Sequence, residues 1–353
     1  MPTPTIDPFE LDVPAHALAI YSNVAEQHAR LRRWGVHHRA DGWIAGRPAD
    51  VAAALTSRRL TVAAAFPADR PPVGEARVLQ ARMARFCDGP RHTRRRKLLN
   101  QLLPAVAGLE AEAAQRTCTA LQHGAGAFDV MPLARTVPVV VLAAALGVPT
   151  ADLSRVPALT GRLCDALAPW LGVPPVEPAD GDQAASQLTA LLAQVGPWDD
   201  EQVAAAAGLL FQARDATAGL IGAALLADHA LVDRGTAGRN LAAGIEWTLR
   251  NDAPVQCTRR IAADEVALGG VVVPRGAPVW VVLAAAEQGS PLRPATFGAG
   301  PHSCPGAEHA VALASGVLSA LSSNGCRLVP GQHVRHEPRT NLRIPAAVLV
   351  RQS

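Results

Sequence analysis

One short stretch constrains this chain more than any other: Phe-Gly-Ala-Gly-Pro-His-Ser-Cys-Pro-Gly, residues 297–306. It places Cys304 in a loop punctuated by glycines, directly before residues 307–321, which read as a helix. A thiolate in that place is stabilised by the positive end of the helix and by backbone N–H groups. The glycines permit positive φ, so the backbone can lie flat against a planar ligand. We therefore interpret Cys304 as a ligand for a single iron rather than as half of a disulfide.

Five positions of this stretch match a known pattern, Phe-x-x-Gly-x-His-x-Cys-x-Gly. It resembles the haem-binding loop of the cytochrome P-450 superfamily, with the matching residues Phe297, Gly300, His302, Cys304 and Gly306. The resemblance implies that Cys304 is the proximal thiolate on haem iron, where it donates electron density to the metal. It also implies that the loop, Gly298 included, packs against haem b, iron protoporphyrin IX. The alternative is an ordinary buried cysteine in a Gly-Pro loop.

The composition favours one large, helix-rich domain. The chain has 353 residues, is 49% hydrophobic, and contains no stretch that resembles a linker. Alanine-rich helical windows dominate, and short strand signals lie between them. With the superfamily resemblance, we expect a single domain over residues 1–353, mainly α with small β-sheets, in the cytochrome P-450 fold around a buried haem. Residues 1–14 are expected to form a flexible N-terminal segment.

Charge, aromatic content and cysteine spacing argue against several other classes of protein. The net charge is +3 and aromatic residues make up 4%, with one tyrosine, which does not support nucleic-acid binding. The six cysteines are scattered without a Cys-x-x-Cys pair, as in a reduced, cytoplasmic protein. The N-terminus does not resemble a signal peptide, and we expect no apolar run near the roughly 20 residues that span a bilayer. We therefore predict a cytoplasmic protein without nucleic-acid or membrane partners.

Periodicity and capping signals predict helices at 25–33, 49–56, 91–103, 137–146, 184–195 and 199–228. The last of these begins at an acidic cap and is nearly all apolar in its middle, as expected of a helix buried on every side. Residues 37–45 predict a strand pair, and residues 266–282 predict hairpin strands around glycine and Pro-Arg-Gly turns.

Two further stretches resemble the same superfamily. Residues 88–96 resemble its His-x-x-x-Arg helix, and the spacing of four places His92 and Arg96 on one helical face. Residues 258–270 resemble the strand whose arginine binds a haem propionate, with Arg260 at the matching position. The resemblance implies that these three residues and His302 hold the two propionates of the cofactor, since cationic donors suit buried carboxylates.

The other basic residues of the 88–96 helix are interpreted as a surface. They are Arg94, Arg95 and, just beyond, Lys97. In relatives such a patch docks an acidic ferredoxin, and electrostatic steering speeds that encounter. A ferredoxin is therefore the electron donor that the resemblance suggests.

The long apolar helix departs from the superfamily beside the oxygen site. The usual pattern there is Ala-Gly-x-(Asp/Glu)-Thr, whereas this chain has Gln-Ala-Arg-Asp-Ala-Thr at 212–217. Asp215 keeps the acid, Ala216 replaces the alcohol, and Thr217 lies one residue later, about 100° round the helix. These three are the candidate catalytic positions, with Asp215 organising proton delivery. A π-bulge would turn Thr217 inward. Two interpretations follow: Thr217 is structural and oxygen activation uses water or the substrate itself, or protons and electrons are not delivered in the usual way.

Two polar residues of the same helix are candidate substrate contacts. Gln212 occupies a position that is normally small and close to haem. Arg214 needs a partner in an apolar helix, because an unpaired buried charge is costly. It pairs with Asp215 or a propionate, leaves the core, or binds a substrate carboxylate.

Two more departures affect the support of the cysteine loop. The superfamily's Glu-x-x-Arg pair becomes Trp247 and Arg250, with Glu246 displaced by one residue, and the segment before the loop is shortened to 287–295. We expect lower stability or haem retention unless Glu246 reaches Arg250. The shortened segment also puts standard ferredoxin docking in doubt.

Three functions remain open. The first is a haem-thiolate monooxygenase that acts on a small organic molecule in bacterial secondary metabolism. The second is a haem-thiolate enzyme with non-standard chemistry, a peroxygenase or a non-oxidative dehydratase or cyclase, which Ala216 favours. The third is a non-catalytic auxiliary protein, although auxiliaries of that kind tend to lose the cysteine that this chain keeps at position 304.

Overall fold

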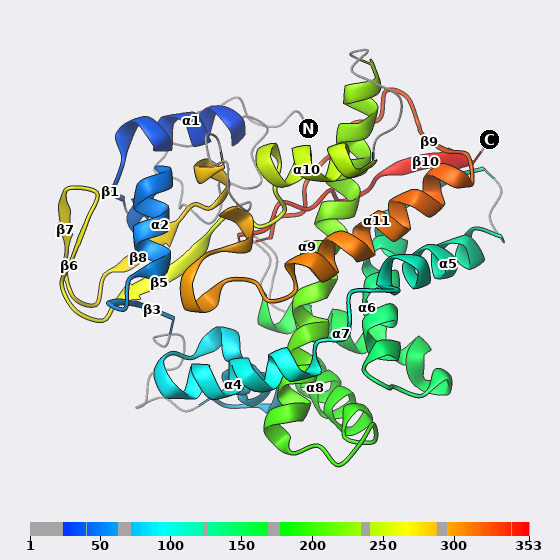
Figure 1. The fold of residues 1–353 in the computed structure, drawn as a ribbon, viewed down its shortest axis with the longest axis horizontal. Helices are drawn as coiled ribbons and strands as arrows, with labels where there is room; N and C mark the ends of the chain where they lie inside the picture. Colours follow the sequence, from blue (N-terminus) through cyan, green and yellow to red (C-terminus); the bar gives the residue numbers. More distant parts are fainter. Residues whose placement is uncertain are drawn as a thin grey trace.

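The computed structural model describes residues 24–39, 41–62, 72–122, 126–168, 177–233, 241–287, 295–339 and 341–352. Within them, most helices gather on one side of the molecule, while the main sheet lies with the first two helices on the other (Figure 1). The expectation of a mainly α protein with small β-sheets is confirmed. The predicted flexible segment 1–14 lies outside the described residues.

The helices are α1 (Val24–Trp34), α2 (Pro48–Thr56), α3 (Glu75–Arg82), α4 (Gly89–Leu102), α5 (Leu109–Leu121), α6 (Met131–Ala145), α7 (Val156–Leu167), α8 (Pro178–Leu192), α9 (Asp200–Asp233), α10 (Leu241–Asn251) and α11 (Ala307–Ser323). The strands are β1 (His37–Arg39), β2 (Gly42–Ala45), β3 (Leu60–Thr61), β4 (Ala127–Asp129), β5 (Thr258–Ala262), β6 (Val266–Leu268), β7 (Val271–Val273), β8 (Pro278–Val281), β9 (Cys326–Leu328) and β10 (Leu349–Gln352).

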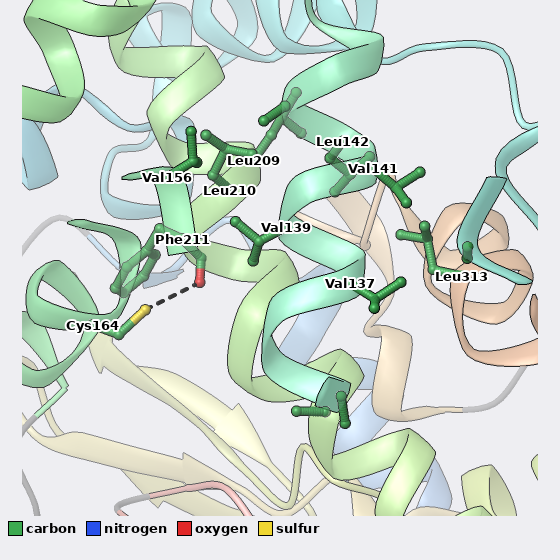
Figure 2. Close-up of a cluster of buried hydrophobic side chains, with 14 of the residues drawn as sticks. Val137, Val139, Val141, Leu142, Val156, Cys164, Leu209, Leu210, Phe211 and Leu313 are labelled. Atoms are coloured by element: carbon green, nitrogen blue, oxygen red, sulfur yellow. Dashed lines mark hydrogen bonds between the residues drawn. The ribbon is translucent and has the colours of Figure 1, made fainter. Parts of the chain in front are cut away.

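The long helix α9 runs through the centre of the helical side. Asp199 and Gln202 cap it reciprocally: the Asp199 carboxylate accepts the Gln202 N–H at 2.8 Å, and the Gln202 amide oxygen accepts the Asp199 N–H at 3.0 Å. Its apolar middle packs against α4, α6, α7, α8, α10 and α11. Figure 2 shows Leu209 and Leu210 of α9 in one apolar cluster with Val139 of α6. The predicted helix that is buried on every side is confirmed.

By length and composition alone, Asp200–Ala227 of α9 also qualifies as a membrane-spanning helix. The expectation that no apolar run reaches that length was therefore wrong. The rest of the protein buries 67% of the apolar window of this helix. Packing against neighbouring helices accounts for its composition.

The main sheet has the strand order β1-β2-β8-β5-β3, in which β2 and β8 are parallel and the other pairs antiparallel. The predicted strand pair at 37–45 is confirmed as β1 and β2. The strands β6 and β7 form the predicted hairpin, but β8 leaves it and pairs with β2 and β5. Val279 and Val281 of β8 are fully buried, so core packing on the main sheet decides its place.

Prolines explain the largest errors in the predicted helix boundaries. The helix predicted from residue 137 begins at Met131, with Pro132 in its first turn and Pro138 inside it. The helix predicted from residue 184 begins at Pro178. Proline fits the first turn because the N–H that it lacks has no helical partner there.

Candidate functional site

A cavity of about 460 Å³ lies between α4, α9, β5 and the loop that carries Cys304. The candidate residues that line it are His92, Arg96, Gln212, Ala216, Thr217, Arg260, Phe297, Gly298, His302, Cys304 and Gly306. Three candidates, Arg214, Asp215 and Gly300, are not among its lining residues. The fold thus brings together residues more than 200 positions apart in the sequence.

The cysteine loop is held by its own backbone. The Cys304 N–H donates to the Phe297 carbonyl at 2.7 Å, and Gly298 and Gly300 both have a φ of +67°. A Cβ at Gly300 would stand 2.8 Å from the Leu55 carbonyl oxygen, so this close approach to α2 requires glycine. Directly after the loop, Gly306 caps α11, and its carbonyl accepts the first helical bond from Ala310 at 2.9 Å. The sulfur therefore lies near the positive end of a helix, as the sequence predicted.

Two histidines meet at one edge of the cavity. The His92 ring of α4 lies 4.2 Å from the His302 ring, centroid to centroid, and His302 Nε2 lies 3.2 Å from Asp88 Oδ1. Burial, with His302 and Arg96 close by, lowers the pKa of His92 to about 4. The Nε2 atom of His92 is buried and has no hydrogen-bond partner among the described residues. An unsatisfied buried nitrogen of this kind marks a place for a ligand.

Two arginines complete that edge. Arg96 donates to the Ser303 carbonyl in the cysteine loop, and Arg260 of β5 donates to Thr258 Oγ1 at 3.0 Å. Burial lowers the pKa of Arg260 to about 10, since the charged form is desolvated. No aspartate or glutamate is among the residues that line the cavity, within the described part of the chain. The edge is therefore strongly cationic and suits an anionic group.

These features fit haem. A thiol stands on one wall, cationic donors and an orphaned imidazole nitrogen stand at one edge, and much of the remaining lining is apolar. A flat, largely apolar ring with two carboxylates and a metal that takes a sulfur ligand matches this set.

The α9 wall carries the candidate polar residues. Gln212, Ala216 and Thr217 all line the cavity, and the Gln212 amide nitrogen donates to the Gly208 carbonyl at 3.1 Å. The helix is α-helical from Asp200 to Asp233, without the π-bulge considered from the sequence. Thr217 reaches the lining nevertheless, since neighbouring positions on one helix can both border a broad cavity.

Asp215 faces a buried ionic cluster instead of the cavity. Arg214 Nη1 lies 2.5 Å from Asp215 Oδ1, Arg339 Nη2 lies 3.5 Å from Asp215 Oδ2, and Arg135 Nε lies 3.8 Å from Oδ1. Glu337 pairs with both Arg135 and Arg339. Of the alternatives considered for Arg214, pairing with Asp215 is the one observed. We therefore leave Arg214 out of the residues proposed to contact a substrate.

The support of the cysteine loop differs from the superfamily pattern. Arg250 Nε lies 3.2 Å from Glu246 Oε1, so the displaced glutamate does reach Arg250, but Glu246 is 67% exposed. The buried acid in this region is Glu287, whose Oε1 accepts the Thr296 N–H at 2.8 Å. Burial raises the pKa of Glu287, and Arg250 opposes that rise. Glu287 thus ties the entry of the cysteine loop to the core.

Sequence reasoning missed two residues of this site, Glu287 and Arg85. Glu287 stands in the shortened segment before the loop, where no pattern marked it. Arg85 lines the cavity from the short turn Ala84–Phe86, just ahead of α4. The available signal was a lone arginine between apolar residues directly before the His-x-x-x-Arg helix.

No family model matches the chain. Among curated proteins it is 28% identical to cytochrome P450 BJ-3 of Bradyrhizobium diazoefficiens over 242 residues, which cover 57% of this chain and 56% of that protein. It is 32% identical to cytochrome P450 107B1 of Saccharopolyspora erythraea over 231 residues, which cover 57% of this chain and 56% of that protein. The chain therefore matches about half the length of these curated relatives.

Solved structures match nearly the whole chain at low identity. CYP109E1 of Bacillus megaterium superposes with a TM-score of 0.78 at 20% identity, covering 94% of this chain and 99% of that one. CalO2 superposes with a TM-score of 0.76 at 22% identity, covering 99% of this chain and 98% of that one. A third structure is the cytochrome P450 enzyme CxnD, described for C–S bond formation in chuangxinmycin biosynthesis. It superposes with a TM-score of 0.72 at 22% identity, covering 93% of this chain and 94% of that one. These likenesses show the fold.

Proposed function

Because this chain belongs to the cytochrome P450 superfamily, we propose that it is a haem-thiolate oxidoreductase, a monooxygenase that acts on a small organic molecule. One observation carries the proposal: Cys304 shares a cavity with His92, Arg96 and Arg260, so an iron ligand and a set of cationic donors face the same space. Similarity to a structure described for a biosynthetic enzyme supports a role in bacterial secondary metabolism. We propose a cytoplasmic location, as the scattered cysteines suggest.

In this proposal the residues divide by what they would hold. Cys304 would hold the iron of haem b, and Phe297, Gly298, Gly300 and Gly306 would shape the loop around that ligand. The propionates would be held by His92, Arg96, Arg260 and His302. When bound, haem supplies the one-electron and O₂ chemistry that the side chains themselves lack.

The chain's own residues would then control water and protons on the α9 wall. Leu209, Ala213 and Leu220 line the cavity there and exclude water from an apolar substrate. Thr217 carries the only hydroxyl among the described α9 residues that line the cavity, so it is the group proposed to hold a proton-carrying water. Ala216 has no group for this task. Asp215 would act indirectly, since its arginine partners fix the turn of α9 that presents Thr217.

A ferredoxin is the proposed electron donor. Arg91, Arg94 and Lys97 of α4 are exposed, whereas Arg95 is buried and bound to Glu201 at 2.6 Å, so only part of the basic run is available for docking. Charge on this surface would speed the encounter with an acidic partner. Lys97→Glu should lower the association rate at low salt.

The alternative is a haem-thiolate enzyme with non-standard chemistry, such as a peroxygenase. The observation in its favour is Ala216, which leaves a methyl group on the cavity wall where relatives carry an alcohol. Turnover with hydrogen peroxide in the absence of any reductase would favour this alternative. Turnover that requires a ferredoxin and its reductase would favour the monooxygenase.

Haem content is the first test of both enzymatic proposals. The purified chain, reconstituted with haem, should bind one equivalent, and substrate turnover should depend on it. If no haem binds, both fail, and a non-catalytic auxiliary protein becomes the better account.

A further inference from the structure

Among the described residues, two carboxamide side chains line the cavity, and each is anchored through its nitrogen. On α9, the Gln212 amide nitrogen donates to the Gly208 carbonyl at 3.1 Å. Away from α9, the Asn341 amide nitrogen donates to the Cys257 carbonyl at 3.4 Å. A carbonyl oxygen can only accept, so these bonds decide which end of each amide is the nitrogen. The amide oxygen of each side chain is therefore the end that is left for another partner.

Neither amide oxygen meets a hydrogen-bond donor within the part of the chain that the structure describes. Ala216 lies one turn after Gln212 on the same face of α9, and its methyl group cannot donate to the Gln212 oxygen. Both amide side chains are half-buried. An acceptor that a ligand covers without a donor costs free energy, so these two oxygens call for donors on the ligand.

The backbone at Asn341 adds an independent observation. Its φ is +60°, and in the described ranges it is the one non-glycine residue with a positive φ. The Asn341 carbonyl accepts the Gln256 N–H at 3.0 Å, and the bridge between Val255 and Leu342 follows directly, so the conformation is held from both sides. Asparagine tolerates this region better than most residues, and backbone held there tends to occur at ligand sites. The chain therefore holds a polar side chain at the cavity at a conformational cost.

The charge of the lining favours neutral donors over charged ones. No aspartate or glutamate is found among the described residues that line the cavity, and four arginines do line it, at positions 85, 96, 259 and 260. An ammonium group would meet no counter-charge there, and desolvating it would be costly. Hydroxyl and amide N–H groups donate hydrogen bonds without carrying a charge.

We infer that Gln212 and Asn341 select the substrate, and that its class is a neutral, largely apolar molecule with two hydrogen-bond donors, hydroxyl or amide N–H groups. The inference rests on the proposed function and specifies the substrate of that same site. The two acceptors lie on different segments of the chain, so a molecule with one donor is held by one of them and a molecule with two by both. Leu209 and Leu220 provide an apolar wall for its body. A compound of the same shape without donors leaves both oxygens unmet and is rejected.

The test uses haem-loaded protein and probes that differ in their capacity to donate. Octane-1,8-diol and bisphenol A are each compared with their dimethyl ethers, which keep both oxygens and are more apolar but cannot donate. Binding is followed by the shift of the Soret band and by equilibrium dialysis. We expect the diols to bind at least about tenfold more tightly than the ethers, since two hydrogen bonds contribute on that scale.

Two variants assign the preference to the two amides. Gln212→Met keeps the length of the side chain and removes its acceptor, so it should weaken binding of the diols by about 3- to 10-fold and leave the ethers unchanged. Asn341→Gly keeps the positive φ without strain and should have the same effect. The control is Gln194→Met just after α8, where an exposed amide nitrogen likewise donates to a carbonyl four residues earlier, Ala190, at 3.2 Å. It should bind every probe as the native chain does.

Equal binding of diols and ethers by the native protein would overturn the inference. So would an equal weakening of diols and ethers by Gln212→Met, because Gln212 would then act through packing alone. If the native chain takes up no haem, the proposed function fails instead. Dialysis of the same probes against the haem-free chain then decides for or against the two amides.

Discussion

The two walls of the cavity differ in how closely they keep the superfamily pattern. The Cys304 wall keeps the matching residues within ten consecutive positions. The α9 wall loses the alcohol at Ala216, and its acid, Asp215, is enclosed by arginines outside the cavity. Under the proposed function, the local loop would hold the cofactor and the rearranged helix would choose the reaction, so the two tasks are separable.

The strongest way to break this comparison is to cut the Asp215 cluster. Arg339 is 2% exposed and contacts Asp165, Asp215 and Glu337. Arg339→Met should lower the free energy of unfolding by about 3–5 kcal/mol, because it leaves buried carboxylates without their partner. Urea denaturation measures the change. The matched control is Arg155→Met, which removes a surface pair with Asp152 and should cost less than about 1 kcal/mol. Equal effects of the two variants would show that the cluster does not support the α9 wall.

At the cationic edge of the cavity, removing one proposed propionate donor should weaken cofactor binding and leave the fold intact. Arg260→Gln is expected to speed haem loss by about 10- to 100-fold, because a charge-assisted hydrogen bond is worth roughly 1.5–3 kcal/mol. Transfer of haem to excess apomyoglobin gives the rate. The control Arg94→Gln should transfer haem at the native rate, and equal rates for native protein and Arg260→Gln would remove Arg260 from the donor set.

Two glutamates sharpen the comparison within the Cys304 wall. Glu287 is 2% exposed and accepts the Thr296 N–H, whereas Glu246 is 67% exposed. Glu287→Leu should lower the free energy of unfolding by about 1–3 kcal/mol, because it leaves a buried N–H unsatisfied. Glu246→Leu should change it by less than about 0.5 kcal/mol. If Glu246→Leu proves the more harmful variant in urea denaturation, the displaced glutamate supports the loop and Glu287 does not.

Acid should destabilise the chain through histidines that belong to neither wall. Burial lowers the pKa of both His28 and His336 to about 4, and the Arg343 charge nearby adds to the effect. Their unfolded pKa is near 6.5, so the unfolded chain binds more protons and stability falls as pH drops from 6.5 toward 4. Between pH 7.5 and pH 5 we expect a loss of at most about 2 kcal/mol per histidine. Urea denaturation at both pH values should show a smaller loss of stability for His28→Gln than for the native chain. If His28→Gln keeps the pH dependence of the native chain, the assignment to His28 is contradicted.

The sequence predicted the elements that adjacent residues determine, and it missed the pairings that depend on contacts between distant residues. The helix that carries His92, the cysteine loop and the buried α9 each follow from adjacent residues, and all three were found. The place of β8 was not, because its pairing with β2 joins strands more than 200 residues apart. The same holds for Arg135 and Arg339, which meet Asp215 only through tertiary packing. Arg85 also could not be placed from the sequence, because only the fold brings it to the cavity lining.

The most direct measurement is the absorption spectrum of the reconstituted protein, first ferric and then reduced under carbon monoxide, for native chain and Cys304→Ala. A thiolate ligand predicts a strongly red-shifted Soret band in the native ferrous–CO state and its absence in Cys304→Ala. A native spectrum without that band, or one that Cys304→Ala leaves unchanged, would contradict the assignment of Cys304 as the iron ligand.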